Sequence, residues 1–353
     1  MLDTTVFLSL KDLGLALPHY AEEVVTLAML DEQSSQYRTM DKKLRDLAIK
    51  NRRYLSTWLQ WSLARPNSAF RDEVVEVDEL DHQGEFLRKK SLMELPAVVS
   101  DETMPKEAWL VDFCRSERQR GRKVLKYLRQ TGTRDIQDRI LKVLRDGGVR
   151  AEVLTSGINP RKREEWIANR VYGLDALVVN PRLVETGLDL VAFSSVVFAE
   201  IEYSLYTLWQ AVRRVWRLGQ TKPVKAMFSV YSEAMEARAL ALMGQKMKAA
   251  QLLYGDEVGG AIVPEEDGDI LMKLAREALE IADLPDLQSL FADEVVVSNS
   301  PMGCPTAPSV PLPTLDAPNV ISWADWIKQK GPARNGTTRG RSRQVTQNQI
   351  SMF

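Results

Sequence analysis

Residues 206–220 read YTLWQAVRRVWRLGQ, a segment in which polar and apolar side chains recur with the period of an α-helix. At helical spacing Gln210, Arg214 and Arg217 stand at i, i+4 and i+7, so their polar ends project from one face. Arginine is permanently charged and forks onto phosphate oxygens, so two arginines about one turn apart make a clamp for a polyphosphate. A solvated amphipathic helix with extra arginines is the alternative that this spacing leaves open.

The other face of this predicted helix carries Leu208, Val212 and Val215, which we expect to pack against a core. The pattern predicts a helix over residues 205–218. Gly219 is a typical helix stop and Pro223 follows shortly after it, so we expect the helix to end there.

Strands and helices alternate along the chain from residue 105 to residue 255. Apolar runs predict strands at residues 123–128, 151–155, 176–180, 196–200 and 224–231. Helical periodicity predicts helices at residues 106–120, 134–145, 161–168, 205–218 and 233–253. Such alternation is typical of an α/β fold, with a mostly parallel sheet covered by helices on both faces. Because ligands of such sheets bind at the carboxyl ends of the strands, we expect most candidate residues to lie there.

The segments on either side of this predicted domain, residues 105–255, differ from it in pattern. Residues 1–104 read as a connecting segment and a helical insertion, with a strand near residues 24–30 and helices over residues 33–65. From Arg65 to Pro105 the pattern becomes charged and irregular, and it includes an acidic run at residues 72–81. We expect this stretch to be a partly exposed insertion with a solvated acidic run. An acidic catalytic cluster is the alternative, and the run lacks the apolar strand that a helicase carboxylate motif needs in front of it.

The end of the chain predicts a helical extension over residues 256–299 and a disordered tail over residues 300–353. Residues 300–318 hold six prolines among small residues, which is the composition of a linker. The cations beyond them have no acidic residue in between: Lys328, Lys330, Arg334, Arg339, Arg341 and Arg343. Such a tail can touch nucleic-acid phosphates without reading sequence, or it can simply keep the protein in solution.

The bulk composition excludes several classes of protein. A net charge of -1, with 44% apolar and 27% charged residues, is ordinary for a globular protein, so a surface for nucleic acid would have to be a local patch. The chain has two cysteines and two histidines in no metal-ligand spacing, which predicts no metal site and a reduced, cytoplasmic setting. The sequence contains no apolar run of about 18 residues, so it predicts no membrane span.

Residues 210–220 resemble motif VI of superfamily-two helicases, in the Swi/Snf-type form Gln-x-x-x-Arg-x-x-Arg-x-Gly-Gln. Residues 180–190 read Asn-Pro-Arg-Leu-Val-Glu-Thr-Gly-Leu-Asp-Leu and resemble motif V of the same family. This chain has Asp189 where the Swi/Snf form commonly has asparagine, and it resembles other helicases of the superfamily there. The two motifs together are specific.

Two earlier loops support this resemblance and stand in the family's order. The loop at residues 130–135, directly after a predicted strand, resembles motif IV in its position. Thr155 and Ser156, with Arg163 on the following helix, resemble the family's next segment, although the hydroxyl residues are shifted against the usual pattern. The resemblance covers residues 105–255 well and residues 10–60 loosely.

The resemblance implies the second RecA-like lobe of a DNA-dependent ATPase and a role for each candidate residue. Arg214 and Arg217 would be arginine fingers that stabilise charge on the transferring phosphoryl group, and Gln210 would orient them or sense the γ-phosphate. Asp189 would meet the ribose of the nucleotide. The full nucleotide-binding set comprises Gly187, Asp189, Arg214 and Arg217. The residues implied to hold one DNA strand's backbone are Gln130, Thr131, Thr155, Ser156 and Thr186.

No Gly-Lys dipeptide occurs in this sequence, so it contains no Gly-x-x-x-x-Gly-Lys-Thr loop to cradle phosphates. The resemblance therefore implies that the chain begins just past the point where a first lobe would stop. The binding site for ATP with Mg²⁺ would then be completed by a first-lobe polypeptide, which would supply most of the magnesium ligands.

Two function classes remain open, and intact motifs V and VI favour the first. The chain is one lobe of an ATPase or translocase acting on double-stranded DNA, or it is a non-catalytic module that kept the lobe's fold and its grip on nucleic acid. A truncated product without function is a third reading that the residues leave open.

Overall fold

The structure, a computed structural model, describes residues 17–80, 86–99, 102–129, 134–184, 188–200 and 205–254. The chain divides into two units, residues 1–299 and 300–353, and every described residue belongs to the first unit. The predicted helical extension and basic tail lie outside the described residues, and the domain boundaries stay predictions. Within the described ranges, no helix combines the length and the apolar character needed to cross a membrane.

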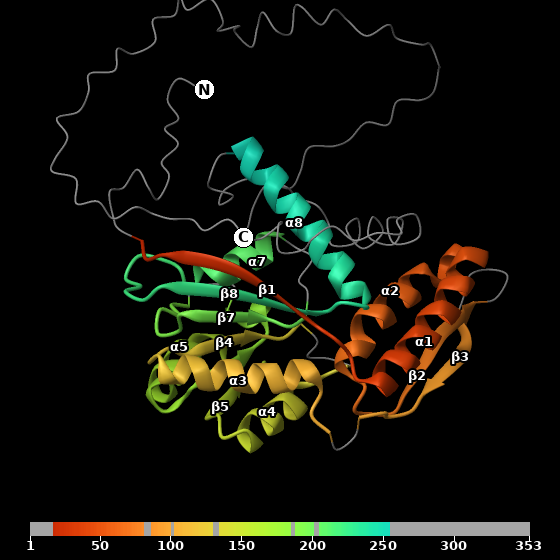
Figure 1. Cartoon of the computed structure of the whole chain (residues 1–353), viewed down its shortest axis with the longest axis horizontal. Coiled ribbons are helices and arrows are strands. Elements are labelled where there is room, and N and C mark those ends of the chain that lie inside the picture. Colours follow the sequence, from red (N-terminus) through yellow and green to blue (C-terminus); the bar gives the residue numbers. More distant parts are fainter. Residues whose placement is uncertain are drawn as a thin grey trace, which may run out of the picture. The chain divides into compact units, whose positions relative to one another are not determined.

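A six-stranded sheet in the order β1-β8-β7-β4-β6-β5 forms the centre of the fold (Figure 1). Every neighbouring pair in it is parallel. Its strands are β1 (Tyr20–Leu27), β4 (Val124–Tyr127), β5 (Ala151–Leu154), β6 (Ala176–Val179), β7 (Ser195–Phe198) and β8 (Val224–Tyr231). The predicted parallel sheet of an α/β fold is confirmed, and β1 begins earlier in the chain than the pattern indicated.

Helices cover both faces of this sheet. Successive side chains of a strand point to opposite sides, so each strand packs against helices on both faces. On one face, Val124, Val178 and Val197 pack with α3 (Pro105–Gln119) and α4 (Gln137–Asp146), which lie together in Figure 1. The alternating residues Leu125, Leu177 and Val196 belong to a second buried cluster. That cluster also contains residues of α5 (Arg163–Arg170) and α7 (Leu205–Arg213). Burial on both faces explains why these strands are continuous apolar runs in the sequence.

Between β1 and α3 the chain forms a subdomain of two helices and a hairpin. Helices α1 (Asp31–Lys50) and α2 (Leu55–Ala64) confirm the predicted helical insertion. Strands β2 (Glu73–Leu80) and β3 (Phe86–Leu95) pair antiparallel, so the prediction of an irregular stretch is wrong. The acidic run alternates with valines, which favour strands, and cross-strand cations offset its charge. The remaining elements are the short helices η2 (Arg52–Tyr54), η3 (Arg65–Asn67), η4 (Pro160–Lys162), η5 (Val171–Gly173) and α6 (Pro181–Val184), and the long helix α8 (Met235–Tyr254).

Buried Arg65 joins the hairpin to the helices of this subdomain. Its guanidinium donates to the side chain of Gln36 on α1 at 2.7 Å and to the carbonyl of Pro96, after β3, at 2.7 Å. It also pairs with Glu73, the first residue of β2, at 3.2 Å. A buried charge is tolerated only when it is paired and hydrogen-bonded, so these partners must stay in place around the guanidinium.

A second buried ion pair joins the subdomain to the sheet and to α8. The Nζ atom of Lys106, in the first turn of α3, lies 2.6 Å from the carboxylate of Glu236, in the first turn of α8. The same Nζ donates to Asn67 Oδ1 at 3.2 Å and to the carbonyl of Ala199, just after β7, at 2.9 Å. These contacts fix the starts of α3 and α8 beside the carboxyl end of a central strand.

We expect Lys106→Met to destabilise the protein by about 3–5 kcal/mol, because Glu236 would keep a buried charge without its counter-ion. Urea unfolding measures this change. Lys142→Met, which removes an exposed lysine from α4, is the matched control and should stay within about 0.5 kcal/mol of the parent. A loss below about 1 kcal/mol for Lys106→Met would contradict a structural role for the pair.

Candidate functional site

The helix that carries the predicted phosphate clamp is shorter than the sequence indicated. Helix α7 ends at Arg213 and the chain continues in turns to Gln220, so the predicted end at residue 218 is wrong. The backbone N–H of Arg214 still donates to the carbonyl of Gln210 at 3.2 Å, which keeps these two residues one helical turn apart. One further bond of this kind, from the N–H of Trp216 to the carbonyl of Val212 at 2.9 Å, precedes Arg217. Gly219 has a φ of 94°, which suits glycine, but it closes the turn and does not end the helix.

The helical pattern breaks at Ala211, whose carbonyl accepts from Tyr127 Oη at 3.0 Å. The backbone N–H of Val215 donates instead to the carbonyl of Val212 at 2.9 Å. In a longer helix the carbonyl of Arg214 would accept from the N–H four residues on. Here it accepts from the backbone N–H of Leu190 at 3.1 Å. Leu208, Val212 and Val215 are buried as predicted, so the apolar face of the segment is kept although its last part is not helical.

The side chain of Gln220 holds these two segments together. Gln220 is 7% exposed, and its Nε2 donates to the carbonyls of Val191 at 3.0 Å, Phe193 at 2.9 Å and Val215 at 3.2 Å. Its Oε1 accepts from the backbone N–H of Lys222 at 3.0 Å. Sequence reasoning quoted Gln220 as the last residue of the motif but assigned it no role. Its place in the motif, beside a turn glycine, was the available signal.

Four candidate residues meet in two pairs where the segments lie together. Arg217 Nη1 hydrogen-bonds Asp189 Oδ1 in an ion pair that is partly exposed on both sides. Arg214 Nη2 lies 3.5 Å from Gln210 Oε1, a long contact. Both arginines are half-buried, so each keeps a face toward solvent. The structure therefore places the predicted nucleotide residues Asp189, Arg214 and Arg217 close to one another.

Strand β1 packs against the same segment. The indole Nε1 of Trp216 donates to the carbonyl of Pro18 at 2.8 Å. The Trp216 ring stacks on Tyr20 with centroids 4.9 Å apart, and the Trp209 ring is tilted against Tyr20 with centroids 6.4 Å apart. These tryptophans pack inside the chain, and the residues before the helical subdomain thus help to shape the turn that carries Arg217.

The candidate DNA-contacting residues lie in a different part of the lobe. Thr155 and Ser156 are exposed directly after β5, at the carboxyl end of that strand. Gln130, Thr131, Thr186 and Gly187 lie outside the described residues. Arg163 braces the loop after β5 by donating to the carbonyls of Ile158 at 3.2 Å and Leu183 at 2.9 Å.

The candidate residues do not all gather at the carboxyl ends of the strands. Asp189 lies in the connection that leads into β7, and Arg217 lies in the connection that leads into β8. The expectation of a shared edge therefore holds for Thr155 and Ser156 but not for the motif V and VI pairs. An α-helix returning antiparallel to the strands carries motif VI away from that edge.

Glu200 and Asn180 were missed by the sequence reasoning, and both support the stem of the loop at residues 130–133. The carboxylate of Glu200, after β7, accepts from the backbone N–H of Arg129 at 2.6 Å. Asn180, after β6, donates to the carbonyl of Arg129 at 3.1 Å. Polar residues that directly follow three neighbouring strands were the available signal, because parallel strands end at one edge.

Residues 105–219 match the family model described as "Helicase conserved C-terminal domain". The chain is 28% identical over 85 residues to "Helicase-like transcription factor CHR28" of Arabidopsis thaliana, which is 24% of this chain and 9% of that protein. It is 26% identical over 117 residues to "Uncharacterized ATP-dependent helicase C23E6.02" of Schizosaccharomyces pombe, which is 32% of this chain and 11% of that protein. The chain thus spans about a tenth of the length of these curated relatives.

Among solved structures, the chain is similar to the crystal structure of the C-terminal part of the Fun30 ATPase domain. The TM-score is 0.44 at 12% identity, over 75% of this chain and 99% of that one.

We expect Gln220→Leu to destabilise the protein by about 2–4 kcal/mol, because the carbonyls of Val191, Phe193 and Val215 would lose a buried donor. Urea unfolding measures this change. Gln60→Leu, at an exposed position on α2, is the matched control and should have little effect. An equal effect of the two substitutions would show that Gln220 is not a structural residue.

Glu22 makes the stability of this region depend on pH. Burial raises the pKa of Glu22 from its ordinary 4.5 to about 7, and the hydrogen bond from Tyr20 opposes part of this rise. That bond, from Tyr20 Oη to Glu22 Oε1, measures 2.6 Å. The native carboxyl therefore keeps its proton up to about pH 7, whereas the unfolded chain loses it near pH 4.5. The native state binds more protons between these values, so stability falls as the pH rises through this window.

We expect Glu22→Gln to remove this loss, because a neutral amide needs no proton to stay buried. The variant should gain about 1–3 kcal/mol over the parent at pH 8 and little or nothing at pH 5. Urea unfolding at the two pH values measures the difference. A gain that is the same at both values would contradict the assignment to Glu22.

Proposed function

We propose that residues 105–219, which match the helicase conserved C-terminal domain, are the C-terminal lobe of a superfamily-two helicase and one half of a DNA-dependent ATPase. The observation that carries the proposal is that Gln220 and the Leu190–Arg214 backbone bond hold together two segments. These segments carry the Arg217–Asp189 ion pair and the Arg214–Gln210 contact. The other half is a first lobe with the phosphate-cradling loop that residues 1–353 do not contain. ATP with Mg²⁺, when bound, supplies the phosphoryl group that is transferred to water.

Arg214 and Arg217 serve this reaction as arginine fingers. Both are half-buried, and their guanidinium groups can fork onto phosphate oxygens. The Arg217–Asp189 ion pair is partly exposed, and such pairs are worth only about 0–1 kcal/mol. Arg217 can therefore leave Asp189 for a phosphate at small cost. The carboxylate of Asp189 is then free to accept a hydrogen bond from a ribose hydroxyl.

Gln210 orients the fingers from within helix α7. Its side chain lies one turn before Arg214, and its backbone carbonyl accepts from the N–H of Arg214. The Trp216 contacts with Pro18 and Tyr20 limit the movement of the turn that follows. Preorganised donors of this kind stabilise developing charge without reorganisation at the moment of reaction.

Double-stranded DNA is the proposed nucleic acid, held through the backbone of one strand by the loops after β4, β5 and β6. The proposed contacts are Gln130, Thr131, Thr155, Ser156 and Thr186. Their hydroxyl and amide groups can bond phosphate oxygens without reading sequence. Glu200 and Asn180 support this role because they hold the stem of the first loop from two neighbouring strands.

Arg214→Ala and Arg217→Ala should each lower ATP turnover by about 10³-fold or more, which is the usual worth of an arginine finger. The measurement is ATP hydrolysis with duplex DNA, for the chain mixed with the polypeptide that supplies the first lobe. Duplex binding should stay within about twofold, because these residues are not proposed to contact DNA. Arg45→Ala, which removes an exposed arginine from α1, is the matched control.

Unchanged turnover in both variants would refute the finger assignment. Salt-dependent duplex binding without turnover in any mixture would identify the chain as the non-catalytic binding module instead.

A further inference from the structure

Six cations gather at the amino-terminal edge of the sheet, the edge opposite the proposed DNA loops. Lys123 directly precedes β4, Arg150 directly precedes β5, and Lys222 lies two residues before β8. Because neighbouring strands are parallel, these residues come to one edge. Three more cations come from the end of α3 and the turn after it. We call the set the amino-edge strip: Arg118, Arg120, Arg122, Lys123, Arg150 and Lys222.

Shared partners show that one half of the strip is continuous. Arg118 Nη1 at 3.3 Å and Arg150 Nη2 at 2.6 Å both reach the carboxylate of Asp175, which directly precedes β6. Lys123 Nζ donates to the carbonyl of Leu174, the residue before Asp175, at 2.6 Å. These three cations therefore surround the amino ends of β4, β5 and β6.

The other half joins the strip through the turn after α3. Arg120 and Arg122 both pair with the carboxylate of Glu117. Lys222 Nζ donates to the carbonyl of Gly121, between these two arginines in the chain. Lys222 therefore turns toward α3, on the face of the sheet away from α7 and the proposed arginine fingers.

The strip carries a surplus of positive charge. Four of its six cations pair with two buried carboxylates, Glu117 and Asp175, and Lys123 and Lys222 donate to backbone carbonyls. The surplus is four charges. The exposed fractions of the side chains of Arg118, Arg120 and Arg150 are 43%, 58% and 60%. Burial lowers the pKa of Lys123, and the charges of Arg150 and Lys222 lower this pKa further. The cations of the strip therefore repel one another.

Helix capping explains only part of this arrangement. Arg118, Arg120 and Arg122 lie at the carboxyl end of α3, where cations complement the helix dipole. Lys123, Arg150 and Lys222 lie in connections that lead into strands, so the dipole of α3 does not explain why these positions are cationic.

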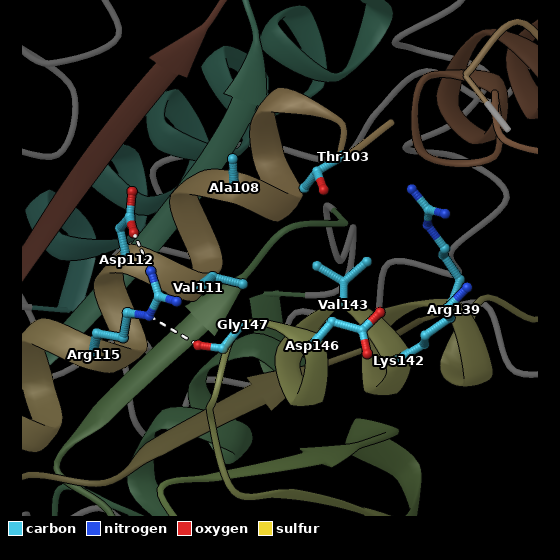
Figure 2. Close-up of a pocket in the computed structure, with 10 residues that line it drawn as sticks. All are labelled: Thr103, Ala108, Val111, Asp112, Arg115, Arg139, Lys142, Val143, Asp146 and Gly147. Carbon is cyan, nitrogen blue, oxygen red and sulfur yellow. Dashed lines mark hydrogen bonds and ion pairs between the residues drawn. The ribbon is translucent and has the colours of Figure 1, made fainter. Parts of the chain in front are cut away.

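The neighbouring groove between α3 and α4 shows what a balanced surface in this region looks like. It encloses about 350 Å³, and its charged rim alternates Arg115, Arg139 and Lys142 with Asp112 and Asp146 (Figure 2). One helical turn beyond Arg115, the end of α3 carries no exposed acidic side chain, and the amino-edge strip begins there. The change from mixed to single-sign charge occurs within one helix.

We propose that the amino-edge strip is a second binding surface for duplex DNA, separate from the loops at the carboxyl ends of the strands. The strip crosses the amino ends of five neighbouring strands, a length of roughly 20 Å at the usual strand spacing. That length matches about six base pairs of a duplex. Four of the six cations are arginines, whose planar forks suit phosphate oxygens.

Phosphate backbone fits the strip better than an acidic protein does. The core of a protein interface is apolar and depleted in charge, whereas the strip is almost entirely cationic. Tyr172, an exposed aromatic residue in η5, precedes Leu174 and Asp175 by two and three residues in the chain. A single aromatic among cations is compatible with a nucleic-acid surface and gives a protein partner little to bury.

The test measures binding of the full chain to a fluorescent duplex of about 20 base pairs between about 50 and 200 mM salt. Arg120→Ala/Lys222→Ala removes two strip cations that do not hold Asp175. Lys42→Ala/Arg45→Ala removes the same charge from exposed positions on α1 and is the matched control. Thr155→Ala/Ser156→Ala addresses the loops of the proposed function. All three pairs keep the basic tail, so its contribution cancels.

The strip variant should flatten the slope of log affinity against log salt by about two and weaken binding on the order of tenfold, and the control should match the parent. With two differently labelled duplexes, energy transfer should show the parent bridging them. The strip variant should keep one duplex and lose the bridge. Arg120→Lys/Lys222→Arg should restore both readouts, which separates a lost charge from a lost fold.

Equal slopes for the strip variant and its control would overturn the proposal, as would bridging that survives in the strip variant. If Arg120→Ala/Lys222→Ala fails to fold, Arg120→Gln alone should lower the slope by about one, and an unchanged slope would again overturn it. Loss of turnover or of DNA contact in the Thr155→Ala/Ser156→Ala variant concerns only the proposed ATPase, so the two proposals fail separately.

Discussion

The buried amide of Gln220 is the contact on which the candidate site depends. Residues 188–193 and 214–220 come from connections that lead into different strands. The amide reaches three carbonyls from these two segments, and one backbone bond, from Leu190 to Arg214, adds to it. The side chains that meet there form a partly exposed ion pair and one long contact, and neither can hold a loop. A rigid buried scaffold therefore presents adaptable charged ends, which suits groups that must exchange partners.

The lobe extends beyond the helicase C-terminal domain matched at residues 105–219. Strand β1 forms an edge of the sheet beside β8, and its flanking residues pack against the turn that carries Arg217. The helical subdomain that follows β1 is tied back by Asn67, which contacts the buried Lys106–Glu236 pair. The residues that precede the conserved domain are thus part of the same hydrogen-bonded structure. A shift of these residues would also move Trp216.

The two edges of the parallel sheet differ in chemistry. The described part of the carboxyl edge mixes hydroxyl and amide groups with Arg129 and Arg182, and the carboxylate of Glu200 holds backbone there. The amino edge offers arginines and lysines over two buried carboxylates. A net charge of -1 for the whole chain hides this difference, because acids elsewhere offset the cations of the strip. Local charge, rather than the average, decides which surface can hold a polyanion.

The sequence by itself determined the class of fold, because strands buried on both faces must be apolar at every position and helices must repeat with their own period. It also determined which residues belong to motifs V and VI, since those patterns are local. Other features depend on residues far apart in the chain and appear only in the tertiary structure. Helix α7 ends at Arg213 where Tyr127, from β4, takes the carbonyl of Ala211, and Asp189 meets Arg217 across two connections.

The same reason explains the remaining differences. The acidic run at residues 72–81 is a strand because β3 supplies its partner cations. Lys123, Arg150 and Lys222 form one surface only because parallel pairing brings the starts of their strands to one edge. Periodicity in the sequence indicates which faces of a segment are buried. Hydrogen bonds and charge contacts between distant segments form only when the chain packs.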